Sequence, residues 1–218
     1  MNIKVKICGL RTPEALDAAL DAGADYFGLV FYGPSPRNID FARAGELAAR
    51  GRGRAKSVAL LVNPDDTEVK RVADEVAPDF IQLHGGETPE RVREVKDLSG
   101  REIIKAVKVE TAGDAATAQN YDGAASFILY DAKESENAQK SLPGGNGVPF
   151  DWRVLMGVKE RGSFMLSGGL TCDNVAAAVL ATGARAVDVS SGVESAPGEK
   201  DAELIRRFVA AAKSANRV

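Results

Sequence analysis

Two short segments near opposite ends of the chain each place polar residues directly after an apolar run. The first is KICGL, which ends its apolar run on Cys8, and the second is VDVSSG, in which two serines and a glycine follow Asp188. Polar residues at the carboxyl end of a parallel strand are typical of the place where such a fold does its chemistry. The first segment offers a thiol, and the second offers a carboxylate with hydroxyls suited to an anionic ligand.

Cys8 is a candidate base. A free thiol has a pKa of about 8.5 and needs a nearby cation or dipole to favour the thiolate at neutral pH. Strand alternation that turns Val5 and Ile7 outward against helices places Lys4, Lys6 and Cys8 on the inner face. Lys6 could then lower the pKa of the Cys8 thiol. The alternative interpretation of Cys8 is a small buried filler.

Two further polar side chains follow apolar runs on the same inner face. Asp131 comes directly after FILY, where partial burial would raise its pKa and let it serve as an acid; its alternative role is an N-cap for the following helix. His84 shares a face with Gln82. It is the only histidine, so we predict no metal site; it either contacts the ligand or is a satisfied loop residue.

Two groups of residues could bind anions. Backbone N–H groups and hydroxyls near the last two apolar runs predict a phosphate site, at Gly168, Gly169, Ser190, Ser191 and Gly192. Gly145 and Gly147 belong to the loop LPGGNG, which is either flexible enough to close over a ligand and add N–H donors or a disordered surface loop. Arg37, on a proline-stiffened loop, could meet a second anion bidentately.

The elements that must position these residues are predicted by eight Val/Ile/Leu-rich runs that alternate with amphipathic stretches. The runs centre on 5–7, 26–31, 57–62, 80–83, 103–107, 126–130, 164–166 and 186–189. Dividing 218 residues by eight gives about 27 per unit, so we predict a compact α/β fold, a (β/α)8 barrel in one domain over 1–218. An open doubly wound sheet is the alternative, but no GxGxxG follows the first run.

Local signals at the ends of the predicted helices support repeated βα units. TPE occurs at 12–14 and again at 88–90, each time an N-cap hydroxyl, a proline at the first helical position and an acid in the first turn. Glycines at 23 and 183 end helices and lead into the next strand. Cys172 is predicted at a helix start beside a capping Thr171, in a structural role.

Composition limits the partners and the compartment. The net charge of −3, with cations and acids interspersed, gives no basic stripe for nucleic acid. No apolar run has membrane-spanning length and the amino terminus lacks a secretory core, so we expect a cytoplasmic protein without a membrane partner. Cys8 and Cys172 are the only cysteines, and we expect two separate thiols rather than a disulfide.

Seven motifs in order along nearly the whole chain resemble the phosphoribosylanthranilate isomerase family of tryptophan biosynthesis. They are KICGL, GLVFYGPSPR, QLHG, ILYDAK, GGNGVPFDW, LSGGL and VDVSSGVE. The resemblance implies a (β/α)8 barrel that catalyses a cofactor-free Amadori rearrangement of the phosphorylated small molecule N-(5-phosphoribosyl)anthranilate, in which an aminoaldose becomes an aminoketose. Two proton transfers suffice for this reaction.

The same resemblance implies roles for individual residues. Asp131 would be the general acid that protonates the furanose ring oxygen, and Cys8 the general base that removes a proton from the adjacent sugar carbon. Arg37 would hold the anthranilate carboxylate, while His84 and Asp188 would line the substrate. The phosphate end would comprise Gly145, Gly147, Gly168, Gly169, Ser190, Ser191 and Gly192. Asn146, where the family often has a small hydroxyl residue, and Tyr130, where an aliphatic residue is usual, depart from the family pattern.

Two alternative functions use the same features. A sugar-phosphate epimerase or a histidine-pathway aminoaldose isomerase would share the phosphate site, but those enzymes usually work with paired acids or metal ligands, and here the base position is a cysteine. A barrel that only binds a phosphorylated metabolite would need the glycines and Arg37 but neither Cys8 nor Asp131. The apolar pattern fits either a monomer or a homodimer.

Overall fold

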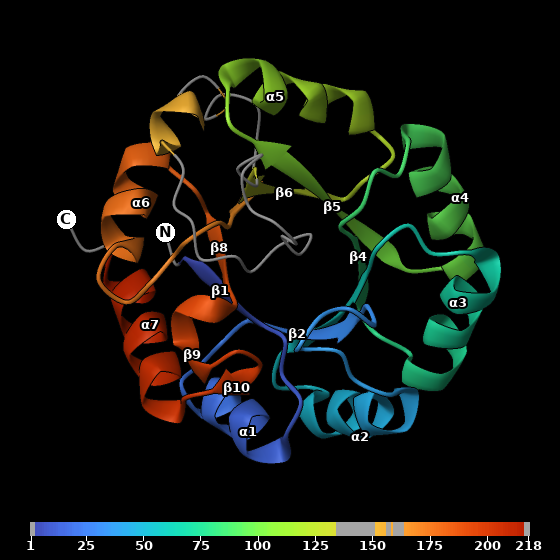
Figure 1. The fold of residues 1–218 in the computed structure, drawn as a ribbon, viewed down its shortest axis with the longest axis horizontal. Coiled ribbons are helices and arrows are strands. Elements are labelled where there is room, and N and C mark those ends of the chain that lie inside the picture. The colour runs from blue at the N-terminus through green and yellow to red at the C-terminus, as the bar shows by residue number, and fades with distance from the viewer. Residues whose placement is uncertain (1–2, 134–150, 156–157, 159–163, 216–218) are drawn as a thin grey trace.

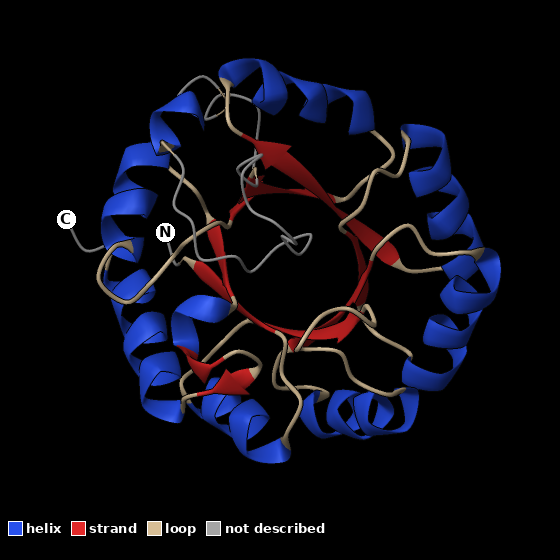
Figure 2. Ribbon diagram, viewed as in Figure 1, coloured by secondary structure: helices blue, strands red, loops and turns tan. Residues whose placement is uncertain are grey.

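The structure, a computed structural model, describes residues 3–133, 151–155, 158 and 164–215. Eight parallel strands close into a barrel in the order of the chain (Figures 1 and 2). They are β1 (Lys4–Cys8), β2 (Tyr26–Phe31), β3 (Lys56–Leu61), β4 (Phe80–Leu83), β5 (Glu102–Val109), β6 (Phe127–Ala132), β7 (Phe164–Leu166) and β8 (Ala186–Val189). Each of the eight predicted runs forms one of these strands, and the predicted (β/α)8 barrel is confirmed.

Helices surround the barrel on all sides (Figure 2). The α-helices are α1 (Pro13–Asp21), α2 (Phe41–Gly51), α3 (Asp66–Arg71), α4 (Pro89–Ser99), α5 (Ala112–Ala116), α6 (Val175–Thr182) and α7 (Ala202–Ser214). Shorter helical turns are η1 (Val72–Val76), η2 (Thr117–Tyr121), η3 (Trp152–Leu155) and η5 (Ser191–Val193). The outward side chains of the strands, including Val5 and Ile7, pack with the inner faces of these helices into one apolar layer.

The predicted helix caps are present with one exception. The hydroxyls of Thr12 and Thr88 accept hydrogen bonds from backbone N–H groups three residues on, and Gly183 ends α6 in the left-handed conformation. The prediction of Thr171 as a cap is wrong, because α6 begins at Val175 with Asn174 as its N-cap residue. The Asn174 amide oxygen instead accepts a hydrogen bond from the N–H of Thr171, so a local turn precedes the helix.

Side chains that point into the barrel form layers along its axis. An apolar layer made of six residues, Val58, Ile104, Ala106, Leu129, Met165 and Ala186, fills the lumen. Polar and charged side chains lie next to this layer in the lumen, and among these Lys6 and Gln82 are completely buried. Lys105 is also buried, but it lies between Ile104 and Ala106 on β5 and therefore points outward, toward the helices. Lys4, also predicted to point inward, is half-exposed at the amino end of β1 and pairs with Asp25 at 2.6 Å.

A small antiparallel hairpin that the sequence analysis did not predict lies between β8 and α7. It consists of β9 (Glu194–Ala196) and β10 (Glu199–Lys200), and Figure 1 draws it in front of α1. Its turn glycine, Gly198, has a φ of +84°. The hairpin extends the loop after β8 toward the loop that carries Arg37.

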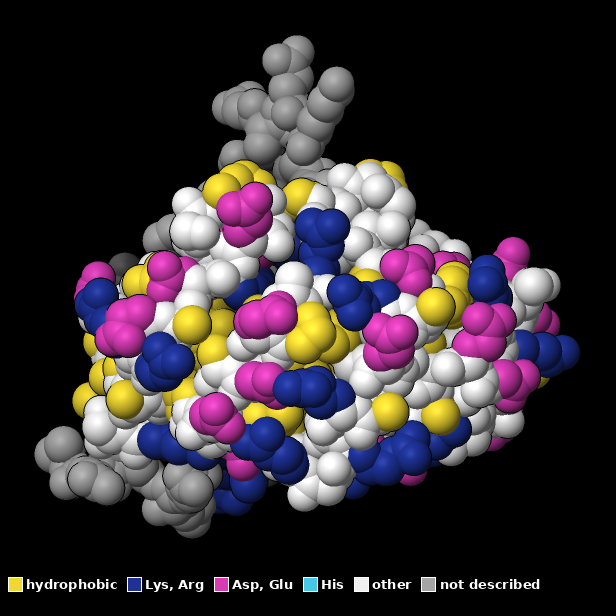
Figure 3. Space-filling model, turned by 90° about the horizontal axis from the view of Figure 1, so that it is seen from below, with side chains coloured by type: hydrophobic (Ala, Val, Ile, Leu, Met, Phe, Trp, Pro, Cys, Tyr) yellow, Lys and Arg dark blue, Asp and Glu magenta, His cyan; other side chains and the backbone are white. Residues whose placement is uncertain are grey.

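The outer surface carries charges of both signs. Lysines and arginines alternate with acids over the face drawn in Figure 3. That face therefore shows no continuous basic patch of the kind that binds a phosphate backbone. Of the helices in the described ranges, none is both long and apolar enough to cross a bilayer.

Candidate active site

Cys8 and Lys6 lie side by side in the lumen, as the alternation of β1 predicts. Both side chains are buried, and Lys6 Nζ lies 2.9 Å from Asp188 Oδ1 on the neighbouring strand β8. Burial alone would lower the pKa of Lys6, but Asp188 and Cys8 outweigh it and the pKa is raised. Lys6 is therefore a fixed positive charge beside the thiol.

The pKa of the Cys8 thiol is nevertheless raised above its ordinary value. Burial is the largest cause, and Asp188 adds to it; Lys6 and Lys200 act in the opposite direction. The prediction of a lowered thiol pKa is therefore wrong in its sign, although Lys6 shifts the pKa in the expected direction. The sequence could place Lys6 beside Cys8 but could not weigh its charge against the burial of the thiol.

Gly28 on β2 provides the space in which Cys8 and Lys6 meet. A Cβ atom at position 28 would lie 2.8 Å from Cys8 Sγ and 3.2 Å from Lys6 Nζ. Every larger residue would therefore displace the thiol or the ammonium. The sequence analysis did not single out Gly28, because a glycine inside an apolar strand has no chemical group of its own.

We predict that Gly28→Ala lowers turnover by about tenfold to a hundredfold, because displacing a reacting group by an ångström is enough for such a loss. Steady-state kinetics of the purified variant would measure this. Gly33→Ala is the matched control, since a Cβ at position 33 meets nothing within 4 Å. Equal turnover in Gly28→Ala and the parent protein would show that the spacing of Cys8 and Lys6 is unimportant.

Asp131 belongs to a buried hydrogen-bonded chain across β4 and β6. His84 Nε2 lies 3.1 Å from Asp131 Oδ2, and Gln82 Nε2 lies 2.8 Å from His84 Nδ1. With Gln82 Nε2 donating to Nδ1, the imidazole carries a proton on Nε2 and donates it to Asp131 Oδ2. Asp131 Oδ1 accepts a hydrogen bond from the N–H of Ala132 at 3.0 Å, so both carboxyl oxygens are held.

A second buried ion pair holds the loop that carries His84 in place. Lys105 Nζ on β5 lies 3.0 Å from Glu87 Oε2, and both side chains are almost fully buried. Lys105 also donates to the carbonyl of Gly85, and Glu87 accepts from the N–H of that residue. His84 is therefore a loop residue whose two ring nitrogens are satisfied by Gln82 and Asp131, and its contact with the ligand stays a prediction.

Arg37 lies in the mouth of the barrel, but its planar edge faces a protein carboxylate. Its Nε and Nη2 each lie 2.8 Å from an oxygen of Glu194 on β9, and both side chains are buried. The bidentate geometry predicted for an external anion is thus made with Glu194. The stem of Arg37 passes over the backbone beside Cys8, since a Cβ on Gly9 would lie 2.7 Å from Arg37 Cδ.

The residues predicted for the phosphate end gather where the loops after β7 and β8 meet. Gly168 and Gly169 both have positive φ, and a Cβ on Gly168 would lie 2.6 Å from the backbone nitrogen of Ala132. Gly192 lies in the short helix η5, after Ser191, and a Cβ there would collide with the carbonyl of Leu170. Gly145, Gly147 and Asn146 lie outside the described residues.

Ser190 and Asp188 connect the phosphate end to the thiol. The Ser190 hydroxyl donates to the carbonyl oxygen of Cys8 at 3.1 Å and accepts from Lys200 Nζ at 3.2 Å. Asp188, besides its ion pair with Lys6, accepts from Ser167 Oγ at 3.4 Å. These side chains therefore form part of the frame around Cys8, and the sequence analysis missed the contribution of Lys200.

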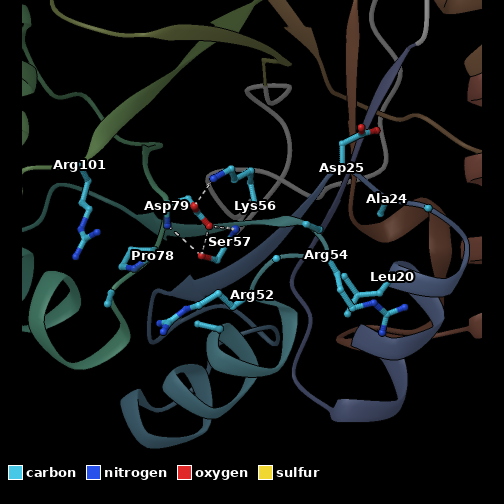
Figure 4. Close-up of a pocket in the computed structure, with 15 residues that line it drawn as sticks. Leu20, Ala24, Asp25, Arg52, Arg54, Lys56, Ser57, Pro78, Asp79 and Arg101 are labelled. Atoms are coloured by element: carbon cyan, nitrogen blue, oxygen red, sulfur yellow. Dashed lines mark hydrogen bonds and ion pairs between the residues drawn. The ribbon is translucent and has the colours of Figure 1, made fainter.

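A separate cavity of about 680 Å³ lies at the opposite, amino end of the strands. Figure 4 shows Lys56 and Ser57, at the start of β3, hydrogen-bonded to Asp79, with Arg52 and Arg101 nearby. None of the residues predicted for catalysis or ligand binding lines this cavity. The candidate active site is accordingly the mouth at the carboxyl end.

Fold and site together define a class: a (β/α)8 barrel whose mouth holds a thiol beside an ammonium, a carboxylate beside an imidazole, and glycine-rich loops suited to phosphate. In the described part of the chain, no three His, Cys, Asp or Glu side chains are grouped in a way that could hold a metal ion. The mouth presents acid–base groups and anion-binding loops in one place.

Comparison with known proteins gives the family. The model of the N-(5'-phosphoribosyl)anthranilate isomerase family matches residues 5–211, and the chain belongs to this family of tryptophan biosynthesis, whose members are aldose–ketose isomerases. The isomerase of Nitrobacter hamburgensis is 52% identical over 215 residues, which cover 99% of this chain and 95% of that protein. The Brucella canis isomerase is 48% identical over 216 residues, or 99% and 96% of the two chains.

Solved structures agree with these relatives. Phosphoribosylanthranilate isomerase from Thermotoga maritima superposes with a TM-score of 0.87 at 35% identity, covering 97% of this chain and 99% of that one. A phosphoribosylanthranilate isomerase in complex with reduced 1-(o-carboxyphenylamino)-1-deoxyribulose 5-phosphate gives a TM-score of 0.84 at 33% identity, with the same coverage. A 3-hexulose-6-phosphate synthase, at 16% identity and a TM-score of 0.67, shares the fold alone.

Proposed function

We propose that this chain catalyses the cofactor-free Amadori rearrangement of N-(5-phosphoribosyl)anthranilate to 1-(2-carboxyphenylamino)-1-deoxyribulose 5-phosphate, with Asp131 as general acid and Cys8 as general base. The observation that carries the proposal is the placement of these two residues in the lumen, at the carboxyl ends of β6 and β1 of one barrel. Membership of the isomerase family supports the choice of substrate.

The first step opens the sugar ring. The Asp131 carboxyl group donates a proton to the furanose ring oxygen, the bond between that oxygen and the anomeric carbon breaks, and the nitrogen lone pair forms the carbon–nitrogen double bond of a Schiff base. His84 Nε2 and the N–H of Ala132 hold the two carboxyl oxygens, so the acid keeps one orientation during this transfer. His84 therefore acts at the reaction through Asp131.

The second step moves the double bond. The Cys8 thiolate removes a proton from the sugar carbon next to the Schiff base, and the electron pair of that bond forms an enolamine, which then tautomerises to the ketone. Lys6, held by Asp188, stabilises the thiolate with its positive charge. The burial that raises the pKa of the thiol also makes its thiolate a stronger base when formed.

The two ends of the substrate are anionic, and the mouth has a region suited to each. The loops that contain Gly168, Gly169, Ser191 and Gly192 offer backbone groups for the phosphate. Arg37 is the candidate for the anthranilate carboxylate, acting from the orientation that Glu194 gives its guanidinium. The structure of a relative in complex with a molecule that carries both a carboxyphenyl group and a phosphate supports a ligand with two anionic ends.

The cytoplasmic location, the single domain over residues 1–218 and the monomeric or homodimeric state remain predictions. One related structure is of monomers generated from the dimeric Thermotoga maritima enzyme. The family match favours this isomerase over the sugar-phosphate epimerase, the histidine-pathway isomerase and the non-catalytic binding barrel.

The decisive experiment follows the loss of phosphoribosylanthranilate fluorescence after adding purified protein in buffer that contains a chelator. We expect rapid loss that is insensitive to the chelator, since two side chains supply both proton transfers. A loss no faster than the spontaneous breakdown of the substrate would contradict the proposed activity. Activity that the chelator abolishes would contradict the cofactor-free mechanism.

A further inference from the structure

The hairpin formed by β9 and β10 brings one carboxylate between two cations at the mouth of the barrel. Glu194 on β9 accepts hydrogen bonds from Arg37 Nε and Nη2, each at 2.8 Å, and from Lys200 Nζ at 2.5 Å. The side chains of Glu194, Arg37 and Lys200 are exposed by only 4%, 7% and 1%. Arg37 is 157 residues from Glu194 in the chain, so this contact is a purely tertiary one.

Neighbouring groups hold both partners of the Arg37–Glu194 pair in place. The hairpin turn packs directly on the arginine loop, because a Cβ on Gly198 would lie 2.5 Å from the carbonyl oxygen of Pro36. Arg11 Nη1 donates to the same carbonyl at 3.0 Å. The planar guanidinium of Arg37 therefore has its position set by the loop and its rotation set by the two oxygens of Glu194.

Lys200 links the carboxylate of Glu194 to the residues that surround the Cys8 thiol. Its Nζ donates to the carbonyl of Ser190 at 2.9 Å and to the Ser190 hydroxyl, which in turn donates to the carbonyl of Cys8. Glu194 thus connects the loop of Arg37 with the end of β1. Burial would raise the pKa of Glu194, but hydrogen bonds from Arg37 and Lys200 outweigh it and lower the pKa to about 2, so the carboxylate stays charged at working pH.

We propose that Glu194 is a positioning residue that orients Arg37 toward the aromatic carboxylate of the substrate, with Lys200 as its second cationic partner. This inference rests on the proposed function, in which Arg37 binds the anthranilate carboxylate of the substrate. It goes beyond that function in making the hairpin part of the substrate-recognition apparatus. Glu194 itself transfers no proton and touches no reacting atom.

The test compares Glu194→Gln with Glu199→Gln, a control on the same hairpin whose side chain is exposed. Glutamine keeps the size of Glu194 but removes its charge and one of its two acceptor oxygens. We expect the KM for phosphoribosylanthranilate to rise about tenfold or more in Glu194→Gln while kcat changes less than threefold, because a misaimed Arg37 weakens binding without changing the acid or the base. Glu199→Gln should match the parent protein.

A double-mutant cycle with Arg37→Lys separates positioning from a merely structural role. If Glu194 acts through Arg37, the loss in the double variant should be smaller than the product of the two single losses. Multiplying losses, or a KM for Glu194→Gln equal to that of the parent protein, would overturn the inference. Glu194→Gln leaves two buried cations without their carboxylate, which could destabilise the fold. A second variant, Glu194→Gln combined with Lys200→Met, removes one of these cations and should show the same rise in KM.

Binding of reduced 1-(o-carboxyphenylamino)-1-deoxyribulose 5-phosphate, measured by calorimetry, separates failure of this inference from failure of the proposed function. Tight binding to the parent protein with about tenfold weaker binding to Glu194→Gln supports both. Equal binding to the two proteins overturns the role of Glu194 alone. A parent protein that neither binds this molecule nor turns over phosphoribosylanthranilate overturns the proposed function and, with it, this inference.

Discussion

Cys8→Ser should lower turnover on the order of a hundredfold or more while KM changes little. A serine hydroxyl occupies nearly the same space but ionises far less readily than a thiol, and Lys6 cannot compensate for this difference. Steady-state kinetics with phosphoribosylanthranilate would give both constants. We expect this to be one of the two largest losses among single substitutions in the barrel.

The matched control for Cys8→Ser is Cys172→Ser, which changes the other cysteine. Cys172 is partly exposed, and its thiol donates a hydrogen bond to the carbonyl oxygen of Leu204. It should leave turnover unchanged. The pH profile offers a second readout: burial raises the pKa of Cys8, so the deprotonated base accumulates only as pH rises past the ordinary cysteine range, and kcat/KM should rise with it. Unchanged turnover in Cys8→Ser would refute its role as the base.

Asp131→Asn should cause a loss of similar size, on the order of a hundredfold or more in kcat, because the amide fills the same space but cannot donate a carboxyl proton to the ring oxygen. The single amide oxygen can accept from only one of the two donors, His84 Nε2 or the N–H of Ala132, so some loss of stability is expected beside the loss of turnover. Rapid-mixing and steady-state assays would place the loss in the chemical step rather than in binding.

The control for Asp131→Asn is Asp122→Asn, an exposed position before β6. Its turnover and its thermal unfolding midpoint should equal those of the parent protein. If Asp131→Asn were merely destabilising, its midpoint would fall and turnover at low temperature would recover. Full activity at any temperature would show that another group protonates the ring oxygen.

The strands and their inner faces were predictable because their signal is local. Each apolar run is bounded by polar or turn-forming residues, and alternation within β1 is enough to turn Cys8 and Lys6 inward. The same reasoning placed Asp131 and His84 on inner faces, and the structure brings them together at 3.1 Å. Local patterns therefore define which residues share the lumen.

The parts of the site that sequence reasoning missed depend on distances between residues far apart in the chain. β9 and β10 have three residues and two residues, too few for a periodic pattern. The bidentate arginine was recognised, but its partner Glu194 was not, because no local rule pairs positions so far apart. The pKa of Cys8 was misjudged for the same reason, since burial by the whole barrel outweighs one neighbouring lysine.

The ion pair between Lys6 and Asp188 joins the first strand of the barrel to the last, at positions that are direct register partners. The ammonium of Lys6, which stabilises the thiolate, is therefore held in place where β1 pairs with β8 and the barrel closes. Any parting of β1 from β8 separates Lys6 from Asp188 before a surrounding helix has to melt. Catalysis therefore depends on the contact between β1 and β8. When the protein is gradually unfolded, we expect activity to be lost before helical content.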